Sequence, residues 1–365
     1  MASTLSFETI NFQPQSPLFS VLPGEIRNEI FEYALMQYED DAAAYPEDSY
    51  WYRPGFSGPR KASSALLQTC KAIYAEGQKV FLRELEWAFW FDRGPDGRSG
   101  NSACLKFFNN LTPQAAQSLE KVRFFTQMYW LEGGSNLRRI FSAPQFRPSE
   151  LTVTIRYSDW WWWESNAALA MKEEWLRTFV GSPGLRKLRV EYETLSWKKA
   201  EMMRIVERNK KWNLLVRRED DAATGFEGYL SAEKTDLEEW TWKGTSKLGG
   251  KTWSHHGKGE KDEMVEYIVV TDTWKFVEGQ LGEEEIKSRG LDHKDWDDDV
   301  NVQYFFDEDD EDEDDEEDDE EDFNDDDVSD EEEDDEEMSE EDDGDDYIDE
   351  DNSVEEEMRD APEVS

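Results

Sequence analysis

The segments LEKVRFF (residues 119–125), LTVTIRY (151–157) and LRKLRVEY (185–192) decide the fold class of this chain. Each is a mainly apolar run of strand length, and similar runs occupy residues 85–91 and 212–216. The stretches between these runs have helical patterns, at residues 103–117, 136–141, 164–180 and 197–209. Because strands and helices alternate, we predict βα units around a mainly parallel sheet, which is the α/β class.

The three quoted segments start 32 and 34 residues apart. This spacing favours an irregular, curved α/β layer that resembles a leucine-rich repeat stack. An ordinary α/β domain with crossovers of similar length is the alternative. Further along the chain, the alternating segments Glu239–Trp242 and Val265–Val269 predict two antiparallel edge strands, with α+β as the alternative class.

Two amphipathic helices are predicted near the N-terminus. The first follows Pro23, which the first turn of a helix tolerates, and its apolar residues recur at a spacing of three to four. These residues are Ile26, Ile30, Tyr33 and Ala34. The second helix spans residues 62–82 and contains LLQTCKAIY at 66–74. Residues 37–61, rich in Asp, Tyr, Pro and Gly, are predicted to form an inserted loop.

The pattern Leu-Pro-x-Glu-Ile at residues 22–26, with LQTCKAIY at 67–74, resembles the F-box-like domains of filamentous fungal proteins. The resemblance covers residues 16–82. It implies a three-helix module that docks on the Skp-type adaptor of a cullin-RING ubiquitin ligase, while the Trp-rich body at 83–290 holds a substrate. The docking residues that it assigns are Leu22, Pro23, Glu25, Ile26, Ile30, Leu67 and Cys70.

The F-box-like segment departs from a compact F-box in its inserted loop. Twenty-five residues, 37–61, separate the two helices, whereas connections between helices usually have about 2 to 8 residues. Two interpretations of the apolar residues stay open. Leu22, Ile26, Ile30 and Leu67 either face an adaptor or lie inside the body, as apolar helix stripes do by default.

Four consecutive tryptophans follow the predicted strand at 151–157. They are Trp160, Trp161, Trp162 and Trp163. In an extended segment, alternate rings point to opposite faces, so that two rings could be exposed. The run is then a candidate substrate platform, since tryptophan is enriched at interface hot spots. Burial of all four rings where a helix meets the sheet is the alternative.

Charge divides the chain into a body and a tail. Residues 291–365 hold 46 acidic and 2 basic residues, which leaves only −4 of the total formal charge of −48 for residues 1–290. The tail cannot bury enough apolar surface to fold, so we predict that it is disordered, and that residues 1–15 are flexible. Its candidate phosphorylation sites, each followed by acidic residues, are Ser329, Ser339 and Ser353.

The polyacidic tail supports a second functional hypothesis, in which it binds histones or other basic proteins in the manner of a chaperone. It could also bind the basic residues between Lys198 and Arg218 of its own body. The same negative charge disfavours binding to nucleic acid.

The sequence contains no pattern that indicates catalysis, a metal or a cofactor. The glycine-rich segment 244–252 lacks the spacing of a phosphate-binding loop, and three histidines with two cysteines, Cys70 and Cys104, form no recognisable site. We therefore expect a protein-binding function without enzyme activity or cofactors. The few cysteines indicate a reducing compartment, nucleus or cytoplasm, and we expect no signal peptide or membrane span.

Overall fold

The computed structural model of the protein describes residues 11, 13–95, 99–218, 225–253, 264–282 and 284–285. The chain divides into two units, Met1–Tyr304 and Phe305–Ser365, and all described residues belong to the first. The predicted disordered tail at 291–365, with its three candidate phosphorylation sites, lies outside the described residues. So do most of residues 1–15.

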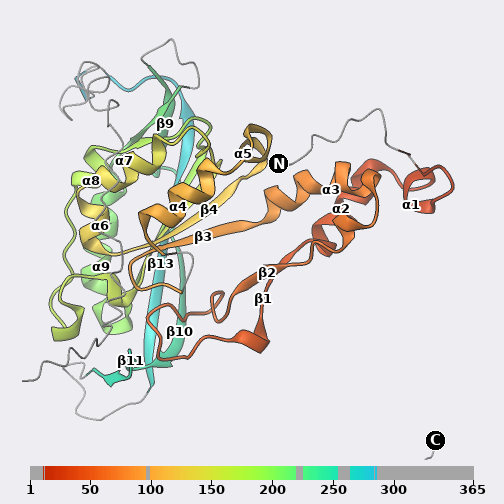
Figure 1. The fold of residues 1–365 in the computed structure, drawn as a ribbon. Coiled ribbons are helices and arrows are strands. Elements are labelled where there is room, and N and C mark those ends of the chain that lie inside the picture. The colour runs from red at the N-terminus through yellow and green to blue at the C-terminus, as the bar shows by residue number, and fades with distance from the viewer. Residues whose placement is uncertain are drawn as a thin grey trace, which may run out of the picture. The chain divides into compact units, whose positions relative to one another are not determined.

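A nine-stranded mixed sheet organises the described part of the chain (Figure 1). Its strands in spatial order are β3 (Glu86–Phe91), β4 (Lys121–Thr126), β5 (Glu150–Ile155), β7 (Lys187–Leu195), β13 (Met264–Glu278), β9 (Phe226–Ser231), β8 (Leu214–Arg217) and β6 (Val180–Gly181), with β10 (Glu238–Thr245) also paired to β13. Strands β3, β4, β5 and β7 are parallel neighbours, whereas β13 is antiparallel to β7, β9 and β10. The fold is therefore mixed α/β, which confirms the predicted class. The expectation of a mainly parallel sheet is wrong, because four of the eight strand pairings in this sheet are antiparallel.

Helices between the strands cover one face of this sheet (Figure 1). They are α4 (Gly100–Asn109), α5 (Pro113–Ser118), α6 (Met128–Glu132), α7 (Ser135–Phe141), α8 (Glu174–Arg177) and α9 (Lys199–Asn209), with short 3-10 helices η4 (Tyr157–Asp159), η5 (Trp163–Ser165) and η6 (Ser196–Lys198). A small hairpin of β11 (Lys247–Leu248) and β12 (Lys251–Thr252) follows β10. Within the described ranges, no helix combines the length and apolar character needed to cross a membrane.

Three helix predictions are corrected. The helix predicted at 62–82 is a 3-10 turn at Leu66–Gln68 followed by an α-helix at Lys71–Glu84. The helix predicted at 103–117 is two helices, because Thr112 caps a new helix by accepting a hydrogen bond from the Ala115 N–H at 3.2 Å. The helix predicted at 164–180 is reduced to the four residues of α8. Trp162 and Asn166 have left-handed backbone angles, with φ of 55° and 52°, and a right-handed helix cannot pass through them.

The strands do not align at the leucines that start the three segments LEKVRFF, LTVTIRY and LRKLRVEY. Leu151 pairs with Val122 on one side and with Leu188 on the other, not with Leu119 and Leu185. The paired residues are 29 and 37 positions apart, so the units of the fold are irregular in length. Register follows which side chains face the core, because a shift of one residue would turn every side chain to the other face.

The late strands β10 and β13 form the predicted antiparallel pair, with Trp240 opposite Val269. Only β10 behaves as an edge strand. β13 is fifteen residues long and pairs with β7 along its other side, so it lies inside the sheet. Its residues from Tyr267 to Trp274 are all buried, as expected of a strand covered on both faces.

The two faces of the sheet differ in polarity. The helix-covered face carries the main core, where the side chains of Phe124, Val153 and Val190 are fully buried. The alternate residues Arg123, Thr154 and Glu191 face the other side and contact one another there. Residues 45–60 lie across this polar face.

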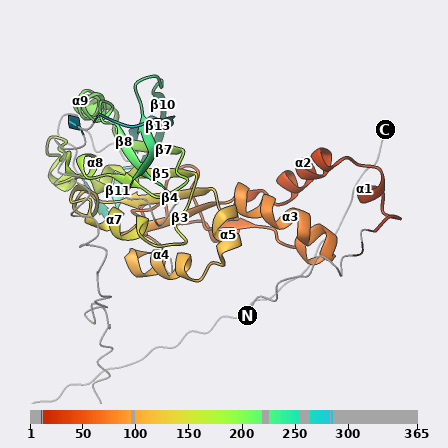
Figure 2. The same ribbon diagram turned by 90° about the horizontal axis from the view of Figure 1, so that it is seen from above.

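The N-terminal helices pack as a module beside strand β3 (Figure 2). They are α1 (Pro17–Ser20), α2 (Gly24–Ala34), η3 (Leu66–Gln68) and α3 (Lys71–Glu84). The module core consists of Phe31, Leu35, Leu67, Ile73 and Val80. Gly77 permits the close approach of α3, since a Cβ there would lie 2.8 Å from Leu67 Cδ2.

The module joins the sheet directly, because only Leu85 separates α3 from β3. The inserted residues 37–61 begin and end as a hairpin of β1 (Gln37–Glu39) and β2 (Arg60–Ala62), with η2 (Asp41–Ala43) between them. The Gln37 side chain donates to the Glu86 carbonyl at 3.2 Å and accepts from the Glu86 N–H at 3.3 Å. The Gln37 side-chain amide therefore pairs with the Glu86 backbone in the way that a neighbouring strand would.

Candidate functional site

The first candidate site is the exposed side of α2. Ile26, Ile30 and Tyr33 lie about one turn apart on this helix, and they are 42%, 38% and 80% exposed. Phe31 and Leu35 point to the opposite side and are fully buried in the module core. Helix α2 is apolar on two sides, and the core uses only one of them.

The other residues assigned by the F-box resemblance lie around this exposed side or beneath it. Pro23 and Glu25 are exposed, and Leu22 and Cys70 are half-buried. Leu67 is buried in the module core. Leu67 is thus buried within the helical module, whereas Ile26 and Ile30 are exposed.

An ion pair fixes the orientation of α2 on α3. Arg27 Nε and Nη2 donate to the two carboxylate oxygens of Glu76 at 2.7 and 3.0 Å, and Arg27 Nη1 donates to the Leu22 carbonyl at 2.8 Å. The hydrogen bond and charge of Glu76 raise the pKa of Arg27. A bidentate pair restricts orientation as well as distance, so the exposed side of α2 is held outward.

The four tryptophans divide into a buried pair and an exposed pair. Trp160 and Trp163 are buried, and Trp160 Nε1 donates to the Glu193 carbonyl at 2.8 Å. Trp161 and Trp162 are 37% and 70% exposed. The rings do not alternate as in an extended strand, because the left-handed backbone of Trp162 turns the chain. A platform built from this run would therefore use only the two central rings.

The second candidate site lies on the polar face of the sheet, beneath residues 45–60. Arg53, Pro54, Gly55 and Phe56 form a β-turn in which the Phe56 N–H donates to the Arg53 carbonyl at 2.9 Å. Proline suits the second position of a type II turn, and the third requires the positive φ that Gly55 adopts, 84°. The turn directs the Arg53 and Phe56 side chains onto the sheet, where both are buried.

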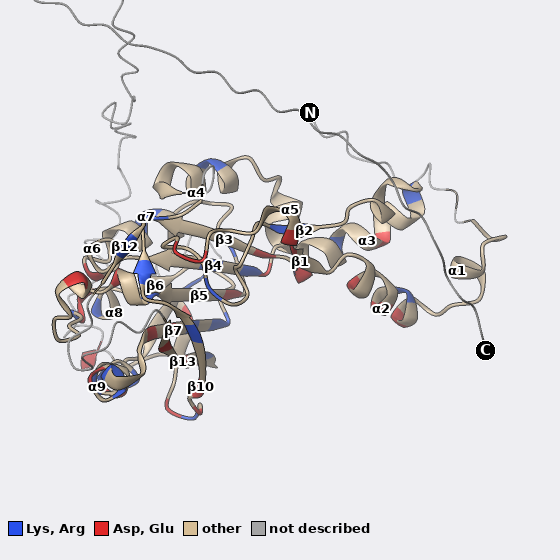
Figure 3. Cartoon of the chain, turned by 90° about the horizontal axis from the view of Figure 1, so that it is seen from below, with Lys and Arg blue, Asp and Glu red and all other residues tan. Residues whose placement is uncertain are grey.

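Arg53 and Arg123 neutralise buried glutamates on this face. Arg123 lies 2.6 Å from the Glu191 carboxylate and 3.0 Å from that of Glu86. Arg53 lies 3.4 Å from Glu191 and 3.6 Å from Glu193. Basic and acidic positions are interspersed along these strands in Figure 3. Charges buried in this way persist only when they are paired, so the network ties the loop to the sheet.

The environment of this network shifts the pKa values of Glu191 and Glu193, the two buried glutamates of β7, in opposite directions. Burial alone would raise the pKa of Glu191, but the charges of Arg123 and Arg53 and the hydrogen bonds that it accepts lower that pKa to about 2. For Glu193, burial dominates and raises the pKa, because Arg53 offsets it only in part. Glu191 is the glutamate that the arginines hold ionised.

Replacing Glu191 by glutamine tests this assignment. A carboxylate with a depressed pKa stabilises the fold above its unfolded pKa of about 4.3, and this contribution is lost as the pH falls to about 2. We expect the stability difference between the unaltered protein and Glu191→Gln to shrink by on the order of 3 kcal/mol between pH 7 and pH 2. Urea unfolding over this pH range measures it. A difference that stays constant with pH would contradict the assignment, and Glu238→Gln, at an exposed pair with Arg189, is the control.

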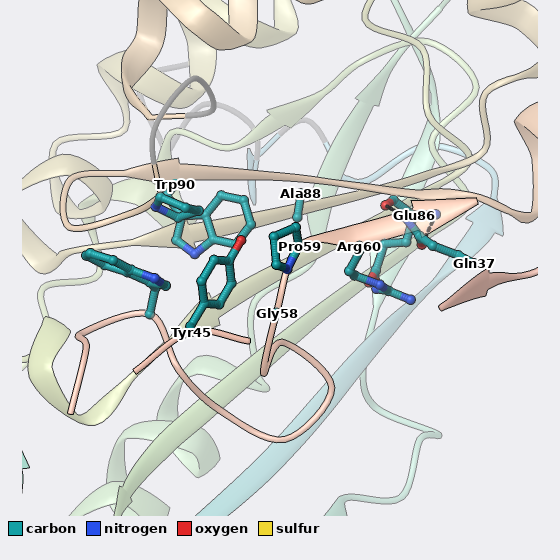
Figure 4. Close-up of a pocket in the computed structure, with 10 residues that line it drawn as sticks. Gln37, Tyr45, Gly58, Pro59, Arg60, Glu86, Ala88 and Trp90 are labelled. Carbon is teal, nitrogen blue, oxygen red and sulfur yellow. Dashed lines mark hydrogen bonds and ion pairs between the residues drawn. The ribbon is translucent and has the colours of Figure 1, made fainter. Parts of the chain in front are cut away.

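A cavity of about 500 Å³ lies between residues 45–60 and strand β3 (Figure 4). Figure 4 shows Tyr45 and Trp90 at one end of the cavity and Gln37, Arg60 and Glu86 at the other. Its volume is within the range of about 300 to 1,000 Å³ typical of small-ligand sites. A second cavity of about 290 Å³ opens onto the charged network.

The sequence interpretation missed the residues around this cavity because it treated residues 37–61 as an insertion into the helical module. The sequence of the loop did contain a signal that it packs on the body. The loop contains Tyr45, Tyr50, Trp51, Tyr52 and Phe56, and so many aromatic side chains are unusual in a solvated linker. Instead, the loop packs on the body and shapes its polar face.

Three of the basic residues on and near α9 are engaged within the body. Lys199 lies 2.6 Å from the Glu239 carboxylate, and Arg208 lies 3.0 Å from that of Glu173. Lys198 is buried and donates to the Asn166 carbonyl at 3.1 Å. These contacts agree with a helix whose basic and acidic residues alternate, and they reduce the charge available to the acidic tail.

Comparisons of this chain with protein-family models, with curated proteins and with solved structures find no match. Functional interpretation therefore depends on the residues and contacts described above.

Proposed function

We propose that this protein is a non-enzymatic binding protein whose F-box-like module, residues 16–82, docks on the Skp-type adaptor of a cullin-RING ubiquitin ligase. The body at 83–290 then holds the protein to be modified. The observation that carries the proposal is the exposed apolar side of α2, formed by Ile26, Ile30 and Tyr33.

The position of these residues on α2 supports a docking role. Single exposed apolar residues are common, but residues spaced by three and four form a continuous stripe along a helix. Val21 and Met36, which flank the helix in sequence, are also exposed. An amphipathic helix that presents such a stripe is a recurring element of protein interfaces.

Charged residues border the stripe and complete the pattern of an interface. Glu25 and Glu29 are exposed on α2 and lie beside Ile26 and Ile30 on the helix surface. An apolar centre with a polar rim is the usual arrangement of a binding patch. The partner surface is then expected to be apolar at its centre and basic or neutral at the edge that meets the two glutamates.

The test is a binding measurement between the full chain and a purified Skp-type adaptor from a filamentous fungus. Each aspartate of an Ile26→Asp, Ile30→Asp variant would place a charge in the apolar centre of the interface, so we expect affinity to fall at least about 100-fold. Both side chains are partly exposed, so the variant should stay folded. Calorimetry measures the affinity, and circular dichroism follows the unfolding.

Two controls separate this proposal from attraction by the acidic tail. Tyr129→Asp places the same charge on an exposed aromatic residue of α6 and should leave adaptor binding unchanged. Binding should also survive an increase to 0.5 M salt, whereas tail-driven binding is screened at that ionic strength. Absence of adaptor binding, with histones bound in a salt-sensitive way, would favour the tail hypothesis instead.

A further inference from the structure

Strand β10 forms an open edge of the sheet. Within the described ranges it pairs with β13 alone, along the eight residues Glu238–Thr245, so no described strand lies along its other side. Figure 3 shows β10 as the outermost strand in the succession that runs from β3 through β5 and β7 to β13. In a strand with one neighbour, every second residue directs its backbone N–H and C=O groups away from the sheet. These groups can pair with a further strand.

The other edges of this sheet offer less. At β3, the backbone of Glu86 pairs with the Gln37 amide, and Trp90 forms a parallel bridge with Ser99. Strand β6, at the other end of the strand order, has only two residues. In the described part of the chain, β10 is therefore the longest edge of the nine-stranded sheet without a partner.

The side chains of β10 complement those of a second β10 strand in an antiparallel pair. A two-fold axis at Thr241 places Glu239 of one copy opposite Lys243 of the other, twice by symmetry. The same axis places Trp240 opposite Trp242 of the other copy, and Thr241 opposite itself. Opposite charges, aromatic pairs and threonine pairs each stabilise antiparallel strands when they lie directly opposite one another.

The neighbouring registers do not match the charges. A two-fold axis perpendicular to the sheet pairs residues on the same face, so the neighbouring axes pass through Trp240 or Trp242. With the axis at Trp240, Glu239 would lie opposite Thr241. With the axis at Trp242, Lys243 would lie opposite Thr241. The arrangement of charges along β10 thus selects the register centred on Thr241.

The residues that would meet are accessible. Glu239 and Lys243 are exposed, and Trp240 is 36% exposed. Glu239 lies 2.6 Å from Lys199 in an exposed ion pair, which contributes little and leaves the carboxylate open to a second cation. Lys243 lies opposite Glu266 of β13 in the same chain. Charges on an edge strand oppose pairing when like charges would meet, but in this register the charges alternate in sign across the interface.

We propose that two copies of this chain associate by antiparallel pairing of their β10 strands about Thr241, which joins the two sheets into one. The occupant of the edge is a second copy, because Glu239 and Lys243 of the same strand complement each other in this register. The surface is separate from the exposed side of α2, so the proposal does not depend on adaptor docking.

Sedimentation velocity of the full chain tests the proposal. The protein is measured over about 1 to 300 µM, which spans the affinities of weak interfaces. A salt concentration of about 0.15 M shortens the Debye length to about 8 Å and screens the repulsion between chains of formal charge −48. We expect a monomer–dimer equilibrium.

Charge reversal tests the register. Glu239→Lys and Lys243→Glu each place like charges opposite one another at two symmetric positions, so each should weaken the dimer at least about tenfold. The double variant Glu239→Lys, Lys243→Glu restores opposite charges in reversed order, and its affinity should return to within about threefold of the unaltered protein. Circular dichroism checks that each variant is folded, and if Glu239→Lys is not, Lys243→Glu carries the test.

Glu238→Lys is the matched control. It changes the net charge by the same amount as Glu239→Lys, but Glu238 lies opposite Gly244 of the second copy, so the dimer affinity should be unchanged. Amide hydrogen exchange is the second readout, and exchange in residues 238–245 should slow as the protein concentration rises.

Four outcomes would overturn the proposal. A monomer at every concentration would leave this edge to a strand of another protein. A dimer without added protection in residues 238–245 would use a different surface. Equal effects of Glu238→Lys and Glu239→Lys, or no recovery in the double variant, would contradict the register centred on Thr241.

Discussion

Replacing Arg123 by leucine is expected to lower the free energy of unfolding by about 3 to 5 kcal/mol, because it leaves the buried Glu191 carboxylate without its nearest partner. Arg123 contacts Glu191 at 2.6 Å and Glu86 at 3.0 Å, and it donates to the Thr154 hydroxyl at 2.8 Å. Arg53 and Arg60 remain near these glutamates, yet neither reaches both of them. Urea denaturation followed by circular dichroism measures the loss.

Two comparisons identify the cause of this loss. Arg189→Leu removes an arginine from β7 whose partner Glu238 is exposed, and should cost no more than about 1 kcal/mol. The double variant Arg123→Leu, Glu191→Leu should be more stable than Arg123→Leu alone, because it no longer buries the Glu191 charge. A cost of less than 1 kcal/mol for Arg123→Leu would show that the loop and sheet are not held by this network.

Trp160→Ala is the second change with a large expected effect, a loss of about 3 to 5 kcal/mol in the free energy of unfolding. The Trp160 ring is buried in the main core, so its removal leaves a cavity. It also removes the indole donor from the Glu193 carbonyl. Thermal and urea unfolding should both report the loss.

Trp162→Ala, at the tryptophan two residues further along the chain, is the matched control. Trp162 is 70% exposed, so Trp162→Ala should change stability by no more than about 0.5 kcal/mol. If the two substitutions destabilise the protein equally, the division of this run into buried and exposed rings is wrong. If both are harmless, Trp160 is not part of the core.

The positions of the parallel strands could be read from the sequence because each one is a short apolar run. The predicted runs at 85–91, 119–125 and 151–157 overlap β3, β4 and β5, with ends that differ by at most two residues. Their register could not be read in the same way. The leading leucines of these runs do not mark it, because the pairing of Leu151 with Val122 depends on which side chains face a core built from distant segments.

The candidate sites were predictable to different extents. The stripe of Ile26 and Ile30 follows from helical periodicity, but its exposure depends on Phe31 and Leu35 occupying the core side of the same helix. The cavity could not be predicted, because Trp51 and Trp90 are far apart in sequence and meet only when the loop crosses the sheet. The spacing of apolar residues identifies the apolar face of a single helix or strand, whereas a cavity depends on packing between segments that are distant in sequence.

The contact between Gln37 and the Glu86 backbone bears on self-association. An edge strand has unpaired N–H and C=O groups that can pair with a strand of another molecule. Such pairing between edge strands is a route to aggregation. In this protein the side-chain amide of Gln37 already pairs with the N–H and C=O groups of Glu86, the first residue of β3. These two backbone groups are therefore not available to the strand of another molecule at the edge where the helical module joins the sheet.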